Sequence, residues 1–77
     1  MMTRTIFTFD TTHHALWAEE IARELGIAHD VVPAPPEAHA RCNIALEALE
    51  EDVPTLSSEM DRVQLSYRLY RALGSGL

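Results

Sequence analysis

The spacing of apolar residues changes along this chain, from every second residue in some segments to every third or fourth residue in others. The order of these segments constrains the fold more than any other feature. Residues 4–10, 27–33, 42–49 and 64–72 are short segments with alternating apolar or β-branched residues, which predicts β-strands. In residues 10–26 and 50–63 the apolar residues recur three or four positions apart, which predicts α-helices. The predicted order of elements is therefore β-α-β-β-α-β.

The two predicted helices also carry start and stop signals. Three adjacent residues can cap the first helix, and a glycine at its far end is a typical terminator: Asp10, Thr11, Thr12 and Gly26. The expected apolar stripes are Ala15, Ala18, Ile21, Ala22 and Leu25 in the first helix and Val53, Leu56, Met60 and Val63 in the second. A proline pair in the connector 34–41 suits the start of one further helical turn.

This order of elements predicts an α+β fold of the ferredoxin-like split βαβ kind. We expect a two-layer sandwich in which an antiparallel sheet of strand order 4-1-3-2 has both helices on one face. The chain has 77 residues and no internal linker or repeat, so residues 1–77 are expected to form one domain, with residues 74–77 as a loose tail. A domain this small often gains stability by pairing, so a homodimer is one expectation.

The balance of charged residues bears on which classes of molecule the protein can bind. Twelve acidic residues face six arginines and no lysine, which gives a net charge of −6 and argues against a nucleic-acid partner. No apolar run approaches the roughly 20 residues that span a membrane. The N-terminal segment lacks the apolar centre of a secretory signal, and the single cysteine has no partner for an internal disulfide. These features favour a cytoplasmic protein without a membrane partner.

The single cysteine, Cys42, is the first candidate for chemistry. In the expected topology the third strand runs antiparallel to the first, so its start should lie beside the end of the first strand and the N-terminus of the first helix. That placement brings Cys42 close to His13 and His14. A helix N-terminus and a nearby imidazole both favour a reactive thiolate. Because cysteine is also among the most buried residue types, a plain core role is an equal alternative.

The sequence also resembles a known family. The segments "IFTFDTTHHALWAEEIARELGI", the proline-bearing connector and "CNIAL" resemble, in order and spacing, the motifs of a small bacterial family of sulfur/selenium carrier-like proteins. The resemblance is good from Ile6 to Leu46, and beyond that the chain is compatible with the short helix and strand that the family would have.

The resemblance implies particular site residues. Cys42 would bear the sulfur or selenium, and Thr12, His13 and His14 form the matching polar cluster. Two positions depart from the family pattern. Asn43 replaces the usual glycine after the cysteine, and the polar run before the cysteine, often serine-rich in the family, carries charge here. Its members His39 and Arg41 could stabilise an anion by charge.

Three functional hypotheses follow. The first is a non-enzymatic carrier, without a cofactor, that holds sulfur or selenium as a persulfide-type adduct on Cys42 and passes it from a donor protein to an acceptor protein. A cycle between two thiols within the chain is disfavoured because the chain has one cysteine. The second is a metal-binding module that uses His13, His14, His39 and Cys42, which ranks lower because adjacent histidines on a helix point about 100° apart. The third is a structural interaction domain with an inert cysteine.

Overall fold

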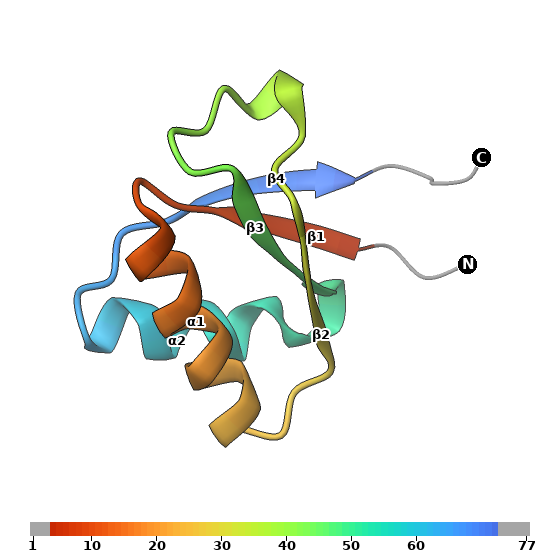
Figure 1. Ribbon diagram of the computed structural model, residues 1–77. Coiled ribbons are helices and arrows are strands. Elements are labelled where there is room, and N and C mark those ends of the chain that lie inside the picture. The colour runs from red at the N-terminus through yellow and green to blue at the C-terminus, as the bar shows by residue number, and fades with distance from the viewer. Residues whose placement is uncertain (1–3, 73–77) are drawn as a thin grey trace.

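The computed structural model describes residues 4–72, and their elements follow the predicted order β-α-β-β-α-β (Figure 1). Two short 3-10 turns, η1 and η2, accompany the strands and helices. The elements are β1 (Arg4–Thr8), α1 (Thr12–Glu24), β2 (His29–Pro33), η1 (Pro36–Ala38), β3 (Ile44–Leu49), η2 (Glu50–Asp52), α2 (Val53–Arg62) and β4 (Arg68–Ala72). The predicted tail, residues 74–77, lies outside the described residues. No helix of residues 4–72 has the length and hydrophobicity needed to cross a membrane.

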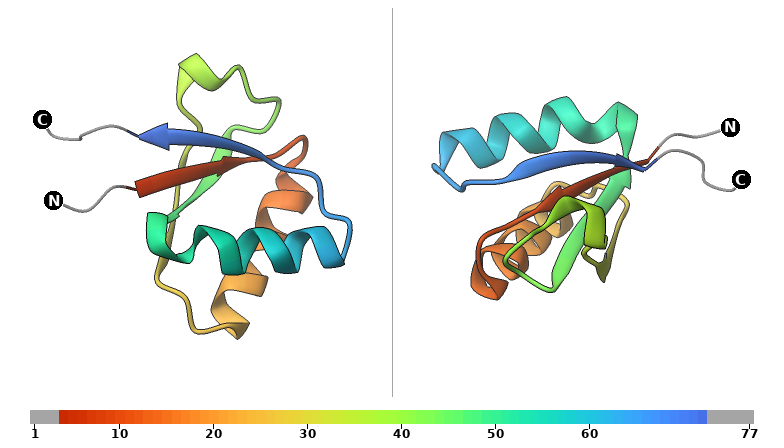
Figure 2. Two further views of the ribbon diagram at one scale, coloured as in Figure 1. Left: turned by 180° about the vertical axis from the view of Figure 1, so that it is seen from behind. Right: turned by 90° about the horizontal axis from the view of Figure 1, so that it is seen from above.

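The four strands form one antiparallel sheet with the order β2-β3-β1-β4. β1 is central: it pairs with β3 on one side and with β4 on the other, with Phe7 opposite both Leu46 and Leu69. Both helices pack on one face of this sheet, so that the molecule has two layers (Figure 2). The predicted α+β class, the antiparallel sheet and the order of elements are confirmed.

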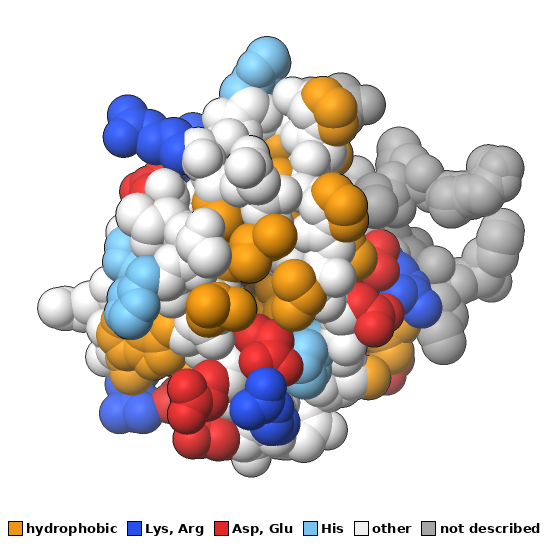
Figure 3. All heavy atoms as spheres, viewed as in Figure 1, with side chains coloured by type: hydrophobic (Ala, Val, Ile, Leu, Met, Phe, Trp, Pro, Cys, Tyr) orange, Lys and Arg blue, Asp and Glu red, His pale blue; other side chains and the backbone are white. Residues whose placement is uncertain are grey.

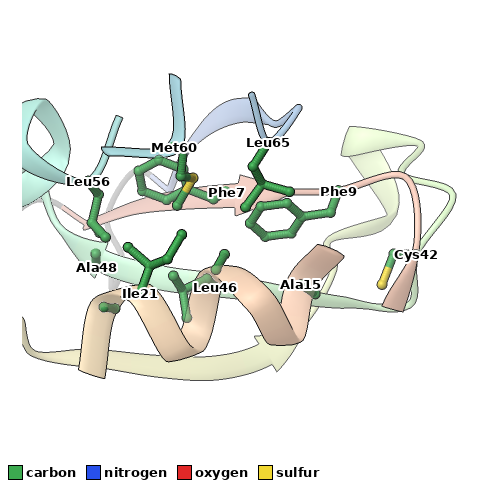
Figure 4. Close-up of a cluster of buried hydrophobic side chains, with 12 residues drawn as sticks. Phe7, Phe9, Ala15, Ile21, Cys42, Leu46, Ala48, Leu56, Met60 and Leu65 are labelled. Carbon is green, nitrogen blue, oxygen red and sulfur yellow. The ribbon is translucent and has the colours of Figure 1, made fainter. Parts of the chain in front are cut away.

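The hydrophobic core lies between the sheet and the helices. Alternation along β1 and β3 directs Phe7 and Leu46 toward α1 and α2, where Leu56 and Met60 are fully buried beside them (Figure 4). Of the stripe predicted for α1, all residues are buried except Leu25, which is 43% exposed. Leu25 differs because the helix ends at Glu24, so that Leu25 is the C-cap and no longer follows the helical spacing.

Local capping sets the ends of α1. The Thr11 hydroxyl accepts a hydrogen bond from the His14 N–H at 3.1 Å, which fixes the helix start. At the other end Gly26 has a φ of +71°, and the Gly26 and Ile27 amides donate to the carbonyls of Arg23 and Ala22. This is the Schellman arrangement, which favours glycine because a side chain resists the left-handed conformation.

The strands are shorter than the sequence predicted. β3 begins at Ile44 instead of Cys42, because the Cys42 amide donates to the Phe9 carbonyl, which lies outside the register that pairs Thr8 with Ala45. β4 begins at Arg68 instead of residue 64, because the chain turns after α2 at Gln64, which has a φ of +61°, and then buries Leu65 in the core. The last strand of the prediction is nonetheless present.

Candidate functional site

Cys42 lies at the corner where β1 passes into α1. Its backbone N–H donates to the Phe9 carbonyl at 3.3 Å, which extends the antiparallel contact between β1 and the start of β3 by one irregular step. The side chain is 3% exposed and forms one end of the core cluster, beside the first turn of α1 (Figure 4). This placement agrees with the prediction that the strand topology brings Cys42 to the start of α1.

Two polar groups contact the sulfur. The Cys42 thiol donates to the Thr12 hydroxyl oxygen with an Sγ to Oγ1 distance of 3.6 Å. The Ile44 backbone N–H donates to Sγ at 3.4 Å. If the sulfur loses its proton, the amide still donates to it and the Thr12 hydroxyl can rotate to do the same. The site therefore offers an anionic sulfur two hydrogen bonds from within the protein.

The histidine pair lies in the first turn of α1, and within residues 4–72 neither His13 nor His14 forms a hydrogen bond with Cys42. The two ring centroids are 6.4 Å apart, and the rings are tilted by 52°. The buried His14 Nδ1 has no hydrogen-bond partner within residues 4–72, and the His14 backbone N–H is already bonded to Thr11. Of the polar cluster that the resemblance implied, Thr12 is thus the member in contact with the sulfur.

The other three predicted residues have exposed side chains around the same corner. His39 and Arg41 line a cavity of about 330 Å³, and the lining of that cavity does not include Cys42. Asn43 takes part through its backbone, because its carbonyl accepts from the Ala34 amide at 2.9 Å. Their predicted role beside the sulfur stays a prediction.

The sequence reasoning missed two kinds of participant. The Ile44 amide contacts the sulfur through the backbone, which no residue type reveals, although an amide two residues beyond a cysteine is a common local donor. Ser66 and Arg68 line the cavity with His39 and Arg41, and finding them needs the register that pairs Thr8 with Arg68. Within the described part of the chain, no group of three or more His, Cys, Asp or Glu side chains lies close enough to hold a metal ion.

His29 belongs to a separate polar contact on β2. Its Nδ1 is 2.7 Å from the Ile27 carbonyl and its Nε2 is 2.8 Å from a Glu19 carboxylate oxygen, so both ring nitrogens can donate only when the ring is protonated. The hydrogen bond to the Ile27 carbonyl, followed by that to Glu19, raises the pKa of His29. The bonds from His29 and then Arg23 lower the pKa of Glu19. This histidine joins β2 to α1, and its hydrogen bonds go to Ile27 and Glu19 and not to the sulfur.

Comparison with known proteins decides the family. A family model described as "Putative Se/S carrier protein-like" matches residues 4–71, which cover the fold from β1 through all but the last residue of β4. The chain belongs to this family. Neither the curated proteins nor the solved structures that were compared with the chain gave a match. The Se/S carrier-like family assignment thus extends past Leu46, where the sequence resemblance was weaker, to α2 and β4.

Proposed function

We propose that this Se/S carrier-like protein carries sulfur or selenium on Cys42 and exchanges it with partner proteins. The observation that supports this most is the surroundings of the Cys42 sulfur, which has a backbone N–H at 3.4 Å and a hydroxyl at 3.6 Å. Both can stabilise an anionic sulfur, and the thiolate is the form that attacks a donor. We further propose that the fold that holds this site is of the ferredoxin-like split βαβ kind.

The proposed step is an exchange of one sulfur atom. The Cys42 thiolate attacks the outer sulfur of a donor persulfide, a new S–S bond forms on Cys42, and the donor leaves as a thiolate. The products are the Cys42 persulfide and a reduced donor thiol, so that no external oxidant or reductant is needed. The reverse attack by an acceptor thiolate returns Cys42 to its starting state, and selenium can follow the same course.

The burial of Cys42 sets a condition on this exchange. A side chain that is 3% exposed cannot meet a donor sulfur unless the segment before β3 moves. Within that segment, residues 34–43, a backbone hydrogen bond from Ala34 to Asn43 joins its two ends, and another from Cys42 to Phe9 holds it to the residue after β1. His39 within it has a φ of +51°, a left-handed conformation that is unfavourable for a non-glycine residue. A displacement of this segment would expose the sulfur while the sheet and helices stay in place.

The same burial favours a second candidate, an interaction domain in which Cys42 is inert. Large apolar side chains are exposed on both α1 and β2, and they include Leu16 at 53% and Val31 at 49%. β2 is an edge strand, and hydrophobic side chains gather over it on the face in view (Figure 3). An exposed edge with apolar neighbours is suited to pairing with another chain.

Intact mass spectrometry tests the carrier proposal. The native protein is incubated with a small-molecule persulfide, and the expected result is a gain of one sulfur atom that a reductant removes. The Cys42→Ala variant should show no gain, which assigns the adduct. If the native protein gains nothing while the same protein unfolded in urea does, Cys42 is an inert core residue and the second candidate is favoured.

A further inference from the structure

The structure contains an unassigned cavity on the side of the Cys42 corner that the sulfur does not line. The cavity has a volume of about 330 Å³ and lies between the start of β4, the end of β1 and the loop after η1. Most of its lining is polar, and the six polar residues are Thr8, Asp10, His39, Arg41, Ser66 and Arg68. Its volume falls at the lower end of the range for small-molecule sites, and its lining suits a charged ligand.

The arginines of the chain divide into those that pair with carboxylates and those that do not. The second group indicates that a ligand of this cavity would be negatively charged. Four of the six arginines form ion pairs with carboxylates, at distances that include 2.8 Å for Arg4 with Glu47 and 2.8 Å for Arg71 with Glu50. Arg23 and Arg62 pair with glutamates on their own helices. Among the side chains that the structure describes, Arg41 and Arg68 have no carboxylate within ion-pair distance.

Both of these unpaired arginines line the same cavity, although they are far apart in the sequence. Arg41 comes from the loop before β3, and Arg68 from the start of β4, opposite Thr8 in the sheet. In a chain with a net charge of −6, two guanidinium groups at one cavity, neither paired with a carboxylate among the described side chains, form a local concentration of positive charge. Guanidinium groups bind tetrahedral oxyanions through paired N–H donors.

We propose that this cavity binds a tetrahedral oxyanion of the phosphate or sulfate type. Arg41 and Arg68 supply the charge, and the hydroxyl of Ser66 and the imidazole of His39 are further hydrogen-bond partners around the same space, whereas the Thr8 hydroxyl already donates to the Arg68 carbonyl. The Asp10 carboxylate in the lining opposes the anion, so the affinity reflects two arginines against one carboxylate. This proposal is independent of the chemistry at Cys42, because the sulfur does not line the cavity.

The test is a titration of the native protein with inorganic phosphate, inorganic sulfate and thiosulfate at low ionic strength. Binding is followed by calorimetry and by the backbone amide signals of residues 38–41 and 66–68, which should move in a saturable way. Arg41→Gln and Arg68→Gln should each weaken binding by roughly threefold to tenfold, since tenfold corresponds to one good charged contact. Asp10→Asn should tighten it.

Arg62→Gln is the matched control, because Arg62 is exposed but already paired with Glu59 on α2. It should leave binding unchanged. A titration with adenosine monophosphate distinguishes a phosphate ester from a free oxyanion as the source, since tighter binding than that of inorganic phosphate identifies the ester. The proposal is overturned if no anion gives saturable shifts, or if Arg62→Gln weakens binding as much as Arg41→Gln and Arg68→Gln do.

Discussion

The Thr12 hydroxyl offers the sharpest test of the environment of Cys42. In the native protein this hydroxyl lies 3.6 Å from Sγ, and its removal by Thr12→Val keeps the shape of the side chain. A hydrogen bond to a charged partner contributes about 1.5–3 kcal/mol, against about 0.5–1.5 kcal/mol between neutral groups. The anionic sulfur therefore loses about 1 kcal/mol more than the thiol, which corresponds to roughly threefold to tenfold less anion at a given pH.

The assay is the rate of alkylation of the native protein by iodoacetamide near neutral pH, where we expect Thr12→Val to react roughly threefold to tenfold more slowly. Thr12→Ser keeps the hydroxyl and should react like the native protein. Because Sγ is buried, hydrogen exchange of the Cys42 and Ile44 amides is measured in parallel to show that local opening is unchanged. An equal rate for Thr12→Val and Thr12→Ser, with equal opening, would refute the reasoning.

Four further predictions concern stability, each measured by urea unfolding. The pKa of His29 is raised in the folded protein, so the stabilisation by the protonated ring is complete below about pH 6.5 and is lost as the pH rises through the folded pKa. The difference in unfolding free energy between the native protein and His29→Gln should therefore shrink as the pH rises through the folded pKa. The Glu19 pKa is lowered, so the contribution of that carboxylate is present above its ordinary pKa of 4.5 and is lost as the pH falls through the folded pKa; Glu19→Gln should therefore cost most at intermediate pH. Phe7→Ala should cost about 3–5 kcal/mol, because Phe7 is fully buried at the centre of the core, and a smaller loss than Leu25→Ala would contradict this placement. Gly26→Ala should cost about 1–2 kcal/mol through the backbone alone, because a Cβ there would meet no atom within 4 Å.

The order of elements and the antiparallel sheet could be predicted because the spacing of apolar residues changes clearly between segments. Phe7 and Phe9 alternate with Ile6 and Thr8, and the α1 stripe of Ala18 and its neighbours has helical spacing. The ends of the strands could not be predicted, because they depend on hydrogen bonds between distant residues. The Cys42 amide bonded to the Phe9 carbonyl is one such case, because this bond lies outside the register that pairs Thr8 with Ala45 and the regular pairing of β3 starts only at Ile44.

The candidate site was predictable only as far as topology reaches. The antiparallel pairing of β1 and β3 was enough to place Cys42 near the start of α1, and the sequence could not say which polar group would touch the sulfur. Thr12 does so, and the two histidines after it form no hydrogen bond with Cys42 within residues 4–72. The cavity of Arg41 and Arg68 needed the pairing of β1 with β4, which brings together residues that share no motif.

The pairing of β1 with β4 also decides where this domain can be joined to other molecules. Arg4 lies opposite Ala72, at the ends of the strands farthest from Thr8 and therefore from the Cys42 corner. A fluorescent label, a surface tether or a second domain attached beyond either residue would leave from the edge opposite that corner. Such attachments suit single-molecule or immobilised measurements in which the sulfur and the neighbouring cavity stay free to meet their ligands.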